Sequence, residues 1–143
     1  MRLAWGIDQP VADFLASKFP IAARRGGFKP HVAVGIVNEA GTLCGGIVMT
    51  DWRGHDACLT IYLEPPAYIS APMVKELCDF VFRKKRMKRV TAEIAKKNRR
   101  ARRYVEGMGF RLEGTLRHGW HDAKDDMCIY GLTYDACKWL ETT

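Results

Sequence analysis

The sequence changes its hydrophobic period at two adjacent prolines, Pro65 and Pro66. Between residues 31 and 64, short apolar or alternating runs are separated by glycine-containing turns, which is typical of consecutive β-strands. Proline lacks the N–H that a strand ladder needs, so the last of these strands ends there. Apolar residues then recur at helical spacing from Ser70 to about Lys84, and strand periodicity returns from Arg89 to Ala95. This strand–helix–strand order predicts a right-handed crossover between two parallel strands.

Further elements flank this crossover on both sides. Asp8 is expected to cap a short first helix that ends near Phe19. Asn98 is expected to cap a helix that Gly109 stops, with its arginines facing solvent. A loop is expected at residues 22–30. Two strands are expected at residues 110–117 and 127–133, and a terminal turn at residues 135–140. Together these elements predict one α/β (α+β) domain over residues 1–143, with a mixed, mostly antiparallel sheet and helices on both faces.

Composition limits the class of protein. The chain has 143 residues, 48% of them hydrophobic, which suits one globular domain. No run of about 18 apolar residues occurs, and Asp8 stands where a signal peptide needs an apolar stretch. We therefore expect a cytoplasmic protein with no membrane partner. The five cysteines are scattered without a C-x-x-C pair, which argues against a zinc ribbon and favours reduced, structural thiols.

Positive charge is concentrated in one segment. The formal net charge is +7, and twelve of the 23 lysines and arginines lie between Arg83 and Arg103. So dense a segment attracts polyanions, such as nucleic acid, an acidic protein or a phosphate-bearing cofactor like coenzyme A. A solvated helix face that keeps the protein soluble is the simpler alternative.

The segment from Asn98 to Arg117 carries a spaced motif. Its fixed positions are Asn98, Ala101, Gly109, Phe110, Glu113, Gly114 and Arg117. The spacing resembles the signature N-x-x-A/S…L-G-F…E-G-x-x-R of the GNAT acyltransferases. It is most similar to the branch that acetylates the N-termini of ribosomal proteins, and to small phage- and prophage-encoded relatives of that branch. The order of elements agrees with that family from about His31 to Trp139.

The resemblance implies acetyl-CoA as cosubstrate and a slot to hold it. In GNAT proteins the central parallel strands splay apart around the pantetheine arm, so here they would diverge after Leu63. The helix that begins at Ser70 would direct its N-terminus at the pyrophosphate, which agrees with the preference of free N–H groups and the helix dipole for anions. Asn98 would contact the cofactor arm, and a plain capping role is compatible with that. The residues expected to bind the cofactor are Tyr62, Leu63, Ser70, Ala71, Met73, Asn98, Ala101 and Arg103.

The chain departs from the family at the phosphate loop and at both proton-transfer positions. Pro72 stands where the loop offers a glycine N–H, so at least one donor to the pyrophosphate is lost, and the basic residues 96–103 could compensate. The family's tyrosine, seven residues after the asparagine, is replaced by Val105, and Tyr104 comes one residue early. The glutamate that often acts as base is missing. Tyr104 and Glu64 are therefore the candidate acid and base, each with an ordinary structural role as the alternative.

A site without a strong base favours one class of amine. An α-amino group with a pKa of about 8 is neutral in roughly a tenth of molecules at pH 7, whereas a lysine with a pKa of about 10.4 is neutral in roughly one in a thousand. We expect an N-acetyltransferase that acts by direct transfer on a primary amine, either a protein N-terminus or a small amine. The alternative is a catalytically weakened GNAT-fold protein whose basic face binds an acidic protein or, less favoured, nucleic acid. Monomer and homodimer both stay open.

Two histidines stand close together in a polar loop. His118 and His121 form an H-x-x-H pair, but no acidic residues accompany them at metal-ligand spacing, so we expect no metal. With Trp120 and Asp122, these histidines could instead form a substrate wall or supply a general base.

Overall fold

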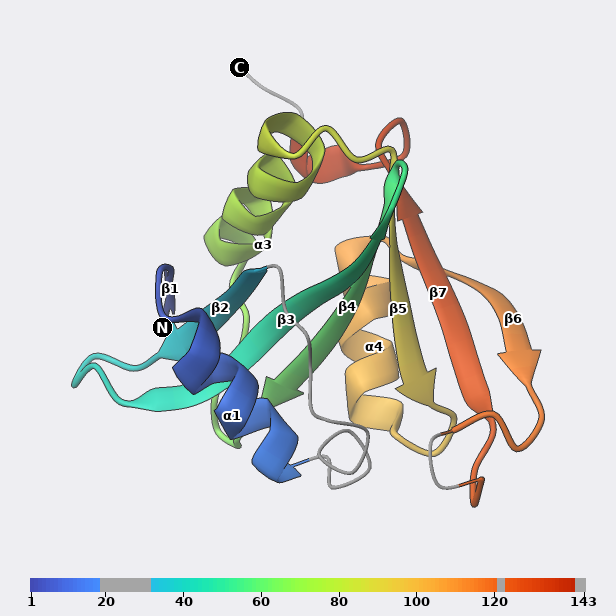
Figure 1. The fold of residues 1–143 in the computed structure, drawn as a ribbon, viewed down its shortest axis with the longest axis horizontal. Helices are drawn as coiled ribbons and strands as arrows, with labels where there is room; N and C mark the ends of the chain where they lie inside the picture. Colours follow the sequence, from blue (N-terminus) through green and yellow to red (C-terminus); the bar gives the residue numbers. More distant parts are fainter. Residues whose placement is uncertain (19–31, 121–122, 141–143) are drawn as a thin grey trace. The chain divides into compact units, whose positions relative to one another are not determined.

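The structure is a computed structural model that describes residues 1–18, 32–120 and 123–140 (Figure 1). Phe19, the loop predicted at residues 22–30, His121 and Asp122 lie outside the described residues. Within these residues, seven strands form one sheet in the order β1-β2-β3-β4-β5-β7-β6, in which β4 and β5 are parallel. The predicted fold class, a mixed and mostly antiparallel sheet combined with helices, is confirmed.

The strands and helices follow the hydrophobic periods of the sequence. The strands are β1 (Arg2–Ala4), β2 (Val32–Val37), β3 (Leu43–Arg53), β4 (Asp56–Leu63), β5 (Arg89–Ala95), β6 (Arg111–Leu116) and β7 (Met127–Thr133). The helices are α1 (Asp8–Lys18), α3 (Ala71–Cys78), a π-helix (Asp79–Lys84), α4 (Arg99–Met108) and a 3-10 helix (Lys138–Leu140). The short strand β1 is the one element that we did not predict. None of these described helices has the length and apolar character needed to cross a membrane.

The chain divides by its contacts into two compact units. The N-terminal unit contains Met1–Thr50 and Leu59–Met73, and the C-terminal unit contains Asp51–Cys58 and Val74–Thr143. The boundary falls inside β4, so its first three residues group with the C-terminal unit and the rest with the N-terminal unit. The expectation of a single domain over residues 1–143 stays a prediction.

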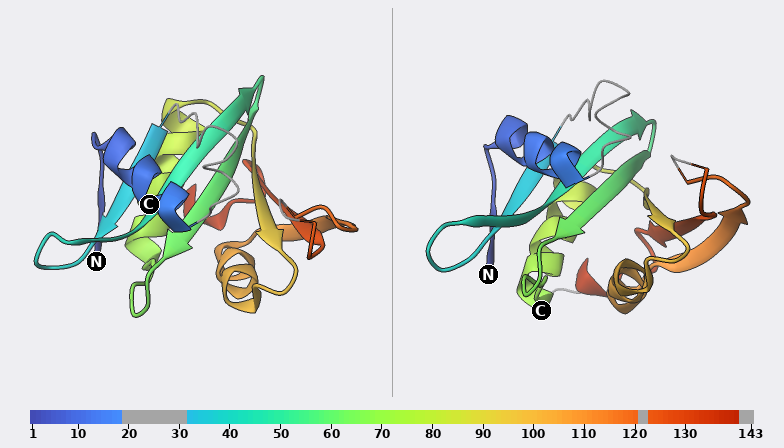
Figure 2. Two further views of the ribbon diagram at one scale, coloured as in Figure 1. Left: turned by 60° about the horizontal axis from the view of Figure 1, so that its bottom comes forward. Right: turned by 90° about the horizontal axis from the view of Figure 1, so that it is seen from below.

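In the N-terminal unit, α1 lies against β2 and β3 (Figure 2). Its apolar stripe places Val11 and Leu15 against Ala33 and Val48, and all four are fully buried. The helix begins at Asp8 itself, so this residue does not stand before the helix as a cap. Its carboxylate instead accepts a hydrogen bond from the N–H of Ala33 at 3.3 Å, which ties the start of α1 to β2.

The helix predicted from Ser70 to about Lys84 changes its geometry part-way. It is an α-helix to Cys78 and a π-helix from Asp79 to Lys84. The wider turn is visible in the bond from the N–H of Lys85 to the carbonyl of Phe80, five residues earlier. This turn leaves the consecutive residues Val81 and Phe82 both buried, which the helical period alone did not predict.

Helix α4 begins and ends as predicted. The side chain of Asn98 accepts a hydrogen bond from the N–H of Ala101 at 3.2 Å, and Gly109 ends the helix with a left-handed φ of 103°. Val105 and Met108 are buried, whereas Ala101 and Tyr104 are only half-buried. The expectation that the arginines of this helix all face solvent is wrong for Arg102, which is half-buried and hydrogen-bonded to the protein.

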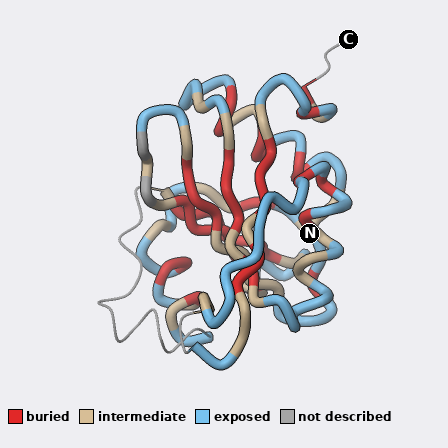
Figure 3. Tube along the Cα trace, turned by 90° about the vertical axis from the view of Figure 1, so that its right-hand side faces the viewer, coloured by how far each residue is buried: buried red, intermediate tan, exposed pale blue. Residues whose placement is uncertain are grey.

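The last three strands form an antiparallel layer of the C-terminal unit. β7 pairs with β5 on one side and with β6 on the other. Buried residues follow the strands, and exposed residues gather at the turns (Figure 3). β6 is the exception, because it lies last in the strand order and all six of its residues are exposed.

Candidate functional site

The candidate base Glu64 sits at the end of β4 in a network of the N-terminal unit. The hydroxyl of Tyr62 donates a hydrogen bond to its Oε2 at 2.6 Å, and the ammonium of Lys18 lies 3.3 Å from the same oxygen. The hydrogen bond from Tyr62, followed by that from Lys18, lowers the pKa of Glu64 below its ordinary value. Both contacts stabilise the carboxylate, so Glu64 is a weaker base than a free glutamate.

The backbone at the end of β4 is hydrogen-bonded on the β3 side. The N–H of Glu64 donates to the carbonyl of Cys44 on the β3 side at 2.8 Å. Because successive N–H groups of a strand point in opposite directions, the N–H of Leu63 points away from β3. This direction is compatible with the role that the family resemblance assigns to Tyr62 and Leu63.

The start of α3 differs from an ideal anion site. The N–H of Ser70 points at the sulfur of buried Met73, 3.4 Å away, and Pro72 has no N–H to give. The first turn of α3 carries no acidic residue, so nothing there opposes an anion. A phosphate held by Ser70 or Ala71 would displace the weak sulfur acceptor, which costs little because thioethers accept hydrogen bonds poorly.

Four of the expected site residues lie along α4, in the C-terminal unit. Asn98 uses its side-chain oxygen to cap the helix, which leaves its NH₂ group as a donor. Ala101 is half-buried and Arg103 is exposed. Tyr104 is half-buried, and the guanidinium of Arg100 lies 5.7 Å from the centre of its ring. Val105, at the position of the family's tyrosine, is 2% exposed and belongs to the core.

The expected site residues therefore fall into two groups. Tyr62, Leu63, Glu64, Ser70, Ala71 and Met73 belong to the N-terminal unit, and Asn98, Ala101, Arg103 and Tyr104 belong to the C-terminal unit. Within the first group the structure brings Tyr62 and Glu64 into contact, and within the second it joins Asn98 to Ala101. Their roles in catalysis and in cofactor binding stay predictions.

A buried tyrosine joins α4 to β7. Tyr130 is fully buried, and its hydroxyl accepts a hydrogen bond from Nε of Arg102 at 2.9 Å and donates to Glu106 at 2.7 Å. Burial raises the pKa of Tyr130, so the hydroxyl stays protonated and keeps donating. Sequence reasoning missed this network, although the four-residue spacing of Arg102 and Glu106 places both side chains on one face of the helix.

Glu113, which belongs to the GNAT-like motif, forms an ion pair. Its carboxylate lies 2.7 Å from Nη2 of Arg89, and Nε of the same arginine lies 3.5 Å from Asp56. The pair crosses β7 at Gly131, where a β-carbon would collide with the Glu113 carboxylate and lie 2.6 Å from Nη2 of Arg89. The glycine in β7 therefore makes room for a link between β5 and β6.

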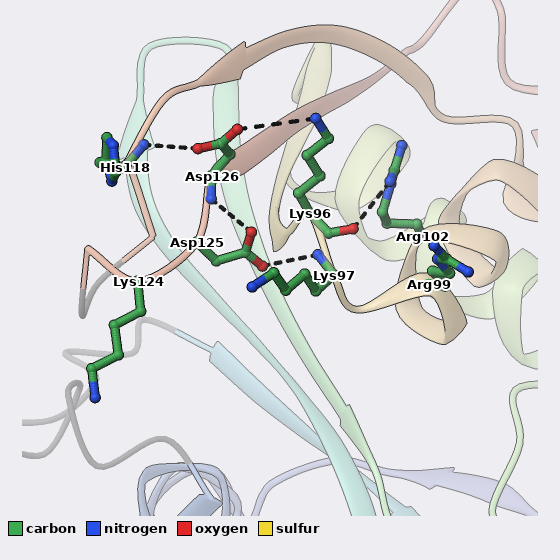
Figure 4. Close-up of a pocket in the computed structure, with 8 residues that line it drawn as sticks. All are labelled: Lys96, Lys97, Arg99, Arg102, His118, Lys124, Asp125 and Asp126. Atoms are coloured by element: carbon green, nitrogen blue, oxygen red, sulfur yellow. Dashed lines mark hydrogen bonds and ion pairs between the residues drawn. The ribbon is translucent and has the colours of Figure 1, made fainter.

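A basic pocket of about 680 Å³ opens beside the turn between β5 and α4 (Figure 4). It is lined by Lys96, Lys97, Arg99, Arg102, His118, Lys124, Asp125 and Asp126. All of these belong to the C-terminal unit, and they come from the turn after β5 with the start of α4, and from the connection between β6 and β7. Every lining residue is charged or titratable. We call this hollow the basic pocket.

The two aspartates of the basic pocket hold its two turns together. Asp125 accepts hydrogen bonds from the N–H groups of Lys97 at 2.9 Å and Asp126 at 2.7 Å, and these bonds, the one from Lys97 first, lower its pKa. Asp126 accepts from the N–H of His118 at 2.9 Å, and Lys96 lies 4.0 Å from its other oxygen. Figure 4 shows Asp126 between these two partners.

His118 lies at the edge of the same pocket with one ring nitrogen engaged. Its Nδ1 is 3.2 Å from the carbonyl of Ala123, an acceptor, so Nδ1 carries the proton in that contact. In the neutral ring Nε2 is then the acceptor. The alternative of a metal site finds no support in the described part of the chain, where no three histidine, cysteine or acidic side chains gather to hold a metal ion.

Several solved structures with similar folds are acetyltransferases. A spermidine N-acetyltransferase from Vibrio cholerae, in a chimera with hSSAT, matches with a TM-score of 0.71 and 13% identity over 98% of this chain and 99% of its own. The fold is that of the GNAT acetyltransferases. A GNAT-family acetyltransferase from Bacillus anthracis matches with a TM-score of 0.62 and 18% identity over 72% of this chain and 66% of its own. A ribosomal-protein-alanine acetyltransferase from Vibrio fischeri matches with a TM-score of 0.64 and 15% identity, over 85% of this chain and 70% of its own.

These likenesses concern the fold. No family model matches the sequence, and no curated protein matches it. This chain spans 66% of the length of the Bacillus anthracis protein and 70% of the length of the Vibrio fischeri protein.

Proposed function

We propose that this protein is an N-acetyltransferase that transfers an acetyl group from acetyl-CoA to a primary amine. One observation carries the proposal. The segment with GNAT spacing, Asn98 to Arg117, coincides with the β5–α4–β6 connection of a fold that aligns with an N-acetyltransferase over nearly its whole length. The sequence motif and the backbone are separate lines of support for the same family.

The structural details of that segment support the proposal further. Asn98 caps α4 with its side-chain oxygen, so its NH₂ group can still donate a hydrogen bond, as a contact to the cofactor arm requires. Gly109 turns the chain back toward β6, and Glu113 fixes β6 to β5 through Arg89. Asn98, Gly109 and Glu113 therefore each have a local role that keeps the α4–β6 connection in one geometry, on which alignment of two substrates depends.

The reaction consists of one acyl transfer. The lone pair of the neutral amine attacks the thioester carbonyl, a C–N bond forms, and the C–S bond breaks to release coenzyme A as a thiolate. The amine loses one proton to a base, and the thiolate gains one from an acid, so that an amide and free coenzyme A result. Glu64 and Tyr104 are the proposed base and acid. We place the remaining acceleration in alignment of the substrates and in hydrogen bonding to the oxyanion.

The acceptor of this reaction is proposed to be an α-amine. Because Tyr62 and Lys18 lower the pKa of Glu64, this residue is poorly suited to deprotonate a lysine-like ammonium. An α-amino group needs far less help, since roughly a tenth of it is already neutral at pH 7. The neighbours that share the fold include enzymes named for spermidine and for a ribosomal-protein alanine, and the second of these is the better guide to the acceptor here.

Two measurements test the proposal. Calorimetry with acetyl-CoA and with coenzyme A determines whether the cosubstrate binds. Mass spectrometry of a peptide with a free α-amine, with spermidine and with an N-terminally blocked lysine peptide then identifies the acetylated amine. The proposal expects acetyl-CoA binding and acetylation of the free α-amine above the other two. It is overturned if acetyl-CoA does not bind, or if it binds and no amine is acetylated.

A further inference from the structure

The basic pocket contains more positive than negative charge, and its negative charge is committed. Five of its side chains are lysine or arginine, against two aspartates. The carboxylate of Asp125 is occupied by two backbone N–H groups, and that of Asp126 by a third together with Lys96. These carboxylates hold the turns and are poor acceptors for a further cation. A ligand that enters the pocket therefore meets a positive field.

Two cations of the pocket are available to a ligand. Arg102 is engaged with Tyr130 and with the carbonyl of Lys96 at 3.1 Å. By contrast, Lys97 and Arg99 line the pocket without a side-chain hydrogen bond or ion pair to any residue that the structure describes, and the charge of Lys97 is attracted to nearby Asp125. Arg99 offers the planar donor fork that matches a carboxylate, and Lys97 offers a second charge. Their proximity in the β5–α4 turn suits a ligand with more than one negative group.

The sign of this field restricts the acceptor of the proposed reaction. A polyamine such as the spermidine named for the structural neighbours carries several positive charges, and lysines and arginines repel it. Nearby cations also lower the pKa of an amine, because they destabilise its protonated form. An acceptor that combines an α-amine with neighbouring carboxylates gains attraction from its acidic groups and keeps more of its amine neutral.

Resting on the proposed function, we infer that the basic pocket binds the acidic side chains of an acceptor peptide whose N-terminal residue is followed by aspartate or glutamate. The volume of about 680 Å³ is sufficient for a few residues. A peptide is favoured over nucleic acid for two reasons. None of the lining residues is a phenylalanine, tyrosine or tryptophan on which bases could stack, and nucleic acid has no α-amine.

The experiment compares three peptides that share one N-terminal residue and a C-terminal fluorophore. Their positions two to four are all glutamate, all glutamine or all lysine. Binding to the full chain is measured by fluorescence anisotropy without acetyl-CoA, so that it does not depend on catalysis. The glutamate peptide is expected to bind at least about tenfold more tightly than the glutamine peptide, the effect of one charge-assisted hydrogen bond, and the lysine peptide more weakly still.

Variants assign the preference to the pocket. The double variant Lys97→Gln, Arg99→Gln is expected to remove most of the preference for glutamate. The matched control is Arg111→Gln, which removes an exposed cation of the same unit outside the pocket and is expected to keep the preference. Circular dichroism establishes that all variants are folded. Equal affinity for the three peptides, or a preference for glutamate that survives the double variant, overturns the inference.

Two further titrations exclude the other anions. If the double variant weakens binding of coenzyme A but not of the glutamate peptide, the pocket serves the cosubstrate and the inference is wrong. It is also wrong if a single-stranded oligonucleotide binds through Lys97 and Arg99 while the glutamate peptide does not bind. Acetylation that occurs without preference for acidic peptides refutes this inference and leaves the proposed function standing. Selective peptide binding without acetyl-CoA binding refutes the proposed function alone.

Discussion

The hydroxyl of Tyr62 donates to the carboxylate of Glu64 across 2.6 Å, with the two residues only two positions apart at the end of β4. In a strand, such residues lie on the same face, which is why this contact forms without a bend in the chain. Lys18, from the last turn of α1, approaches the same carboxylate. The candidate base is therefore defined by a network that joins α1 to β4.

Replacing Tyr62 with phenylalanine is expected to raise the pKa of Glu64 toward its ordinary value of 4.5, because the strongest stabilising contact of the carboxylate is lost. A carboxylate with a lowered pKa stabilises the fold fully above pH of about 4.5, and this contribution is lost as the pH falls through the lowered pKa. The variant should therefore lose less stability between neutral and acid pH than the wild type. NMR titration of Glu64 and urea unfolding at several pH values measure both effects. An unchanged pKa of Glu64 would contradict this prediction.

Two substitutions at Asn98 separate its two roles. Asn98→Ala removes the acceptor for the N–H of Ala101 and should cost about 1 kcal/mol of stability, the usual cost of a lost helix cap. Asn98→Ser keeps a capping oxygen but loses the NH₂ group, so it should retain most of that stability. If Asn98 binds the cofactor arm, both variants should weaken coenzyme A binding in calorimetry. Normal affinity in Asn98→Ser would leave this residue as a cap alone.

The ion pair between Arg89 and Glu113 should depend on Gly131. Gly131→Ala is expected to push the pair apart and to cost about 0.5–1 kcal/mol, as for a partly exposed ion pair. The double variant Gly131→Ala, Glu113→Gln should lose little more stability than the single variants, because both substitutions remove the same contact. Urea unfolding of the two single variants and the double variant measures this coupling. Gly114→Ala, with no atom near its added β-carbon, is the control. Additive losses would show that the glycine has another role.

The hydroxyl of Tyr130 should contribute measurably to stability. Tyr130→Phe leaves Arg102 and Glu106 without their shared partner and is expected to cost about 1–2 kcal/mol. The control Tyr134→Phe changes a tyrosine that is 45% exposed and packs against Phe82 through its ring, so it should change stability by less than about 0.5 kcal/mol. Thermal unfolding of both variants gives the comparison. Equal losses would mean that the hydroxyl of Tyr130 has no special role.

The features that depend on local periodicity were predictable from the sequence. The strand–helix–strand order, the cap at Asn98 and the left-handed stop at Gly109 follow from spacing and from the conformational freedom of glycine. The family motif placed the same helix in a GNAT fold. Each of these signals lies within about ten to twenty residues of chain, where one sequence window contains all the residues that interact.

The features that depend on distant pairs were not predictable in this way. Nothing in the sequence near Arg102 shows that it faces Tyr130, twenty-eight residues later. The ion pair of Arg89 and Glu113 is visible only once β7 is known to lie between β5 and β6. The lowered pKa of Glu64 comes first from Tyr62, two residues earlier, and then from Lys18, and only the contact with Lys18 is distant in sequence. Tertiary contacts of this kind decide the electrostatics of the site, and hydrophobic periodicity carries no information about them.

Attempts to strengthen anion capture by the basic pocket would naturally begin by deleting Asp125 as an unfavourable charge. Its carboxylate, however, fastens the main chain of Lys97 and of Asp126. Without it, two N–H groups lose their acceptor, and the loop before β7 is then joined to the turn after β5 through Lys96, which donates its N–H to the carbonyl of Asp126 and pairs with its carboxylate. A variant with higher affinity for anions would have to keep Asp125 and add new positive charge at the rim of the pocket. The carboxylate that repels an anion is also the group that holds the neighbouring cationic residues in place.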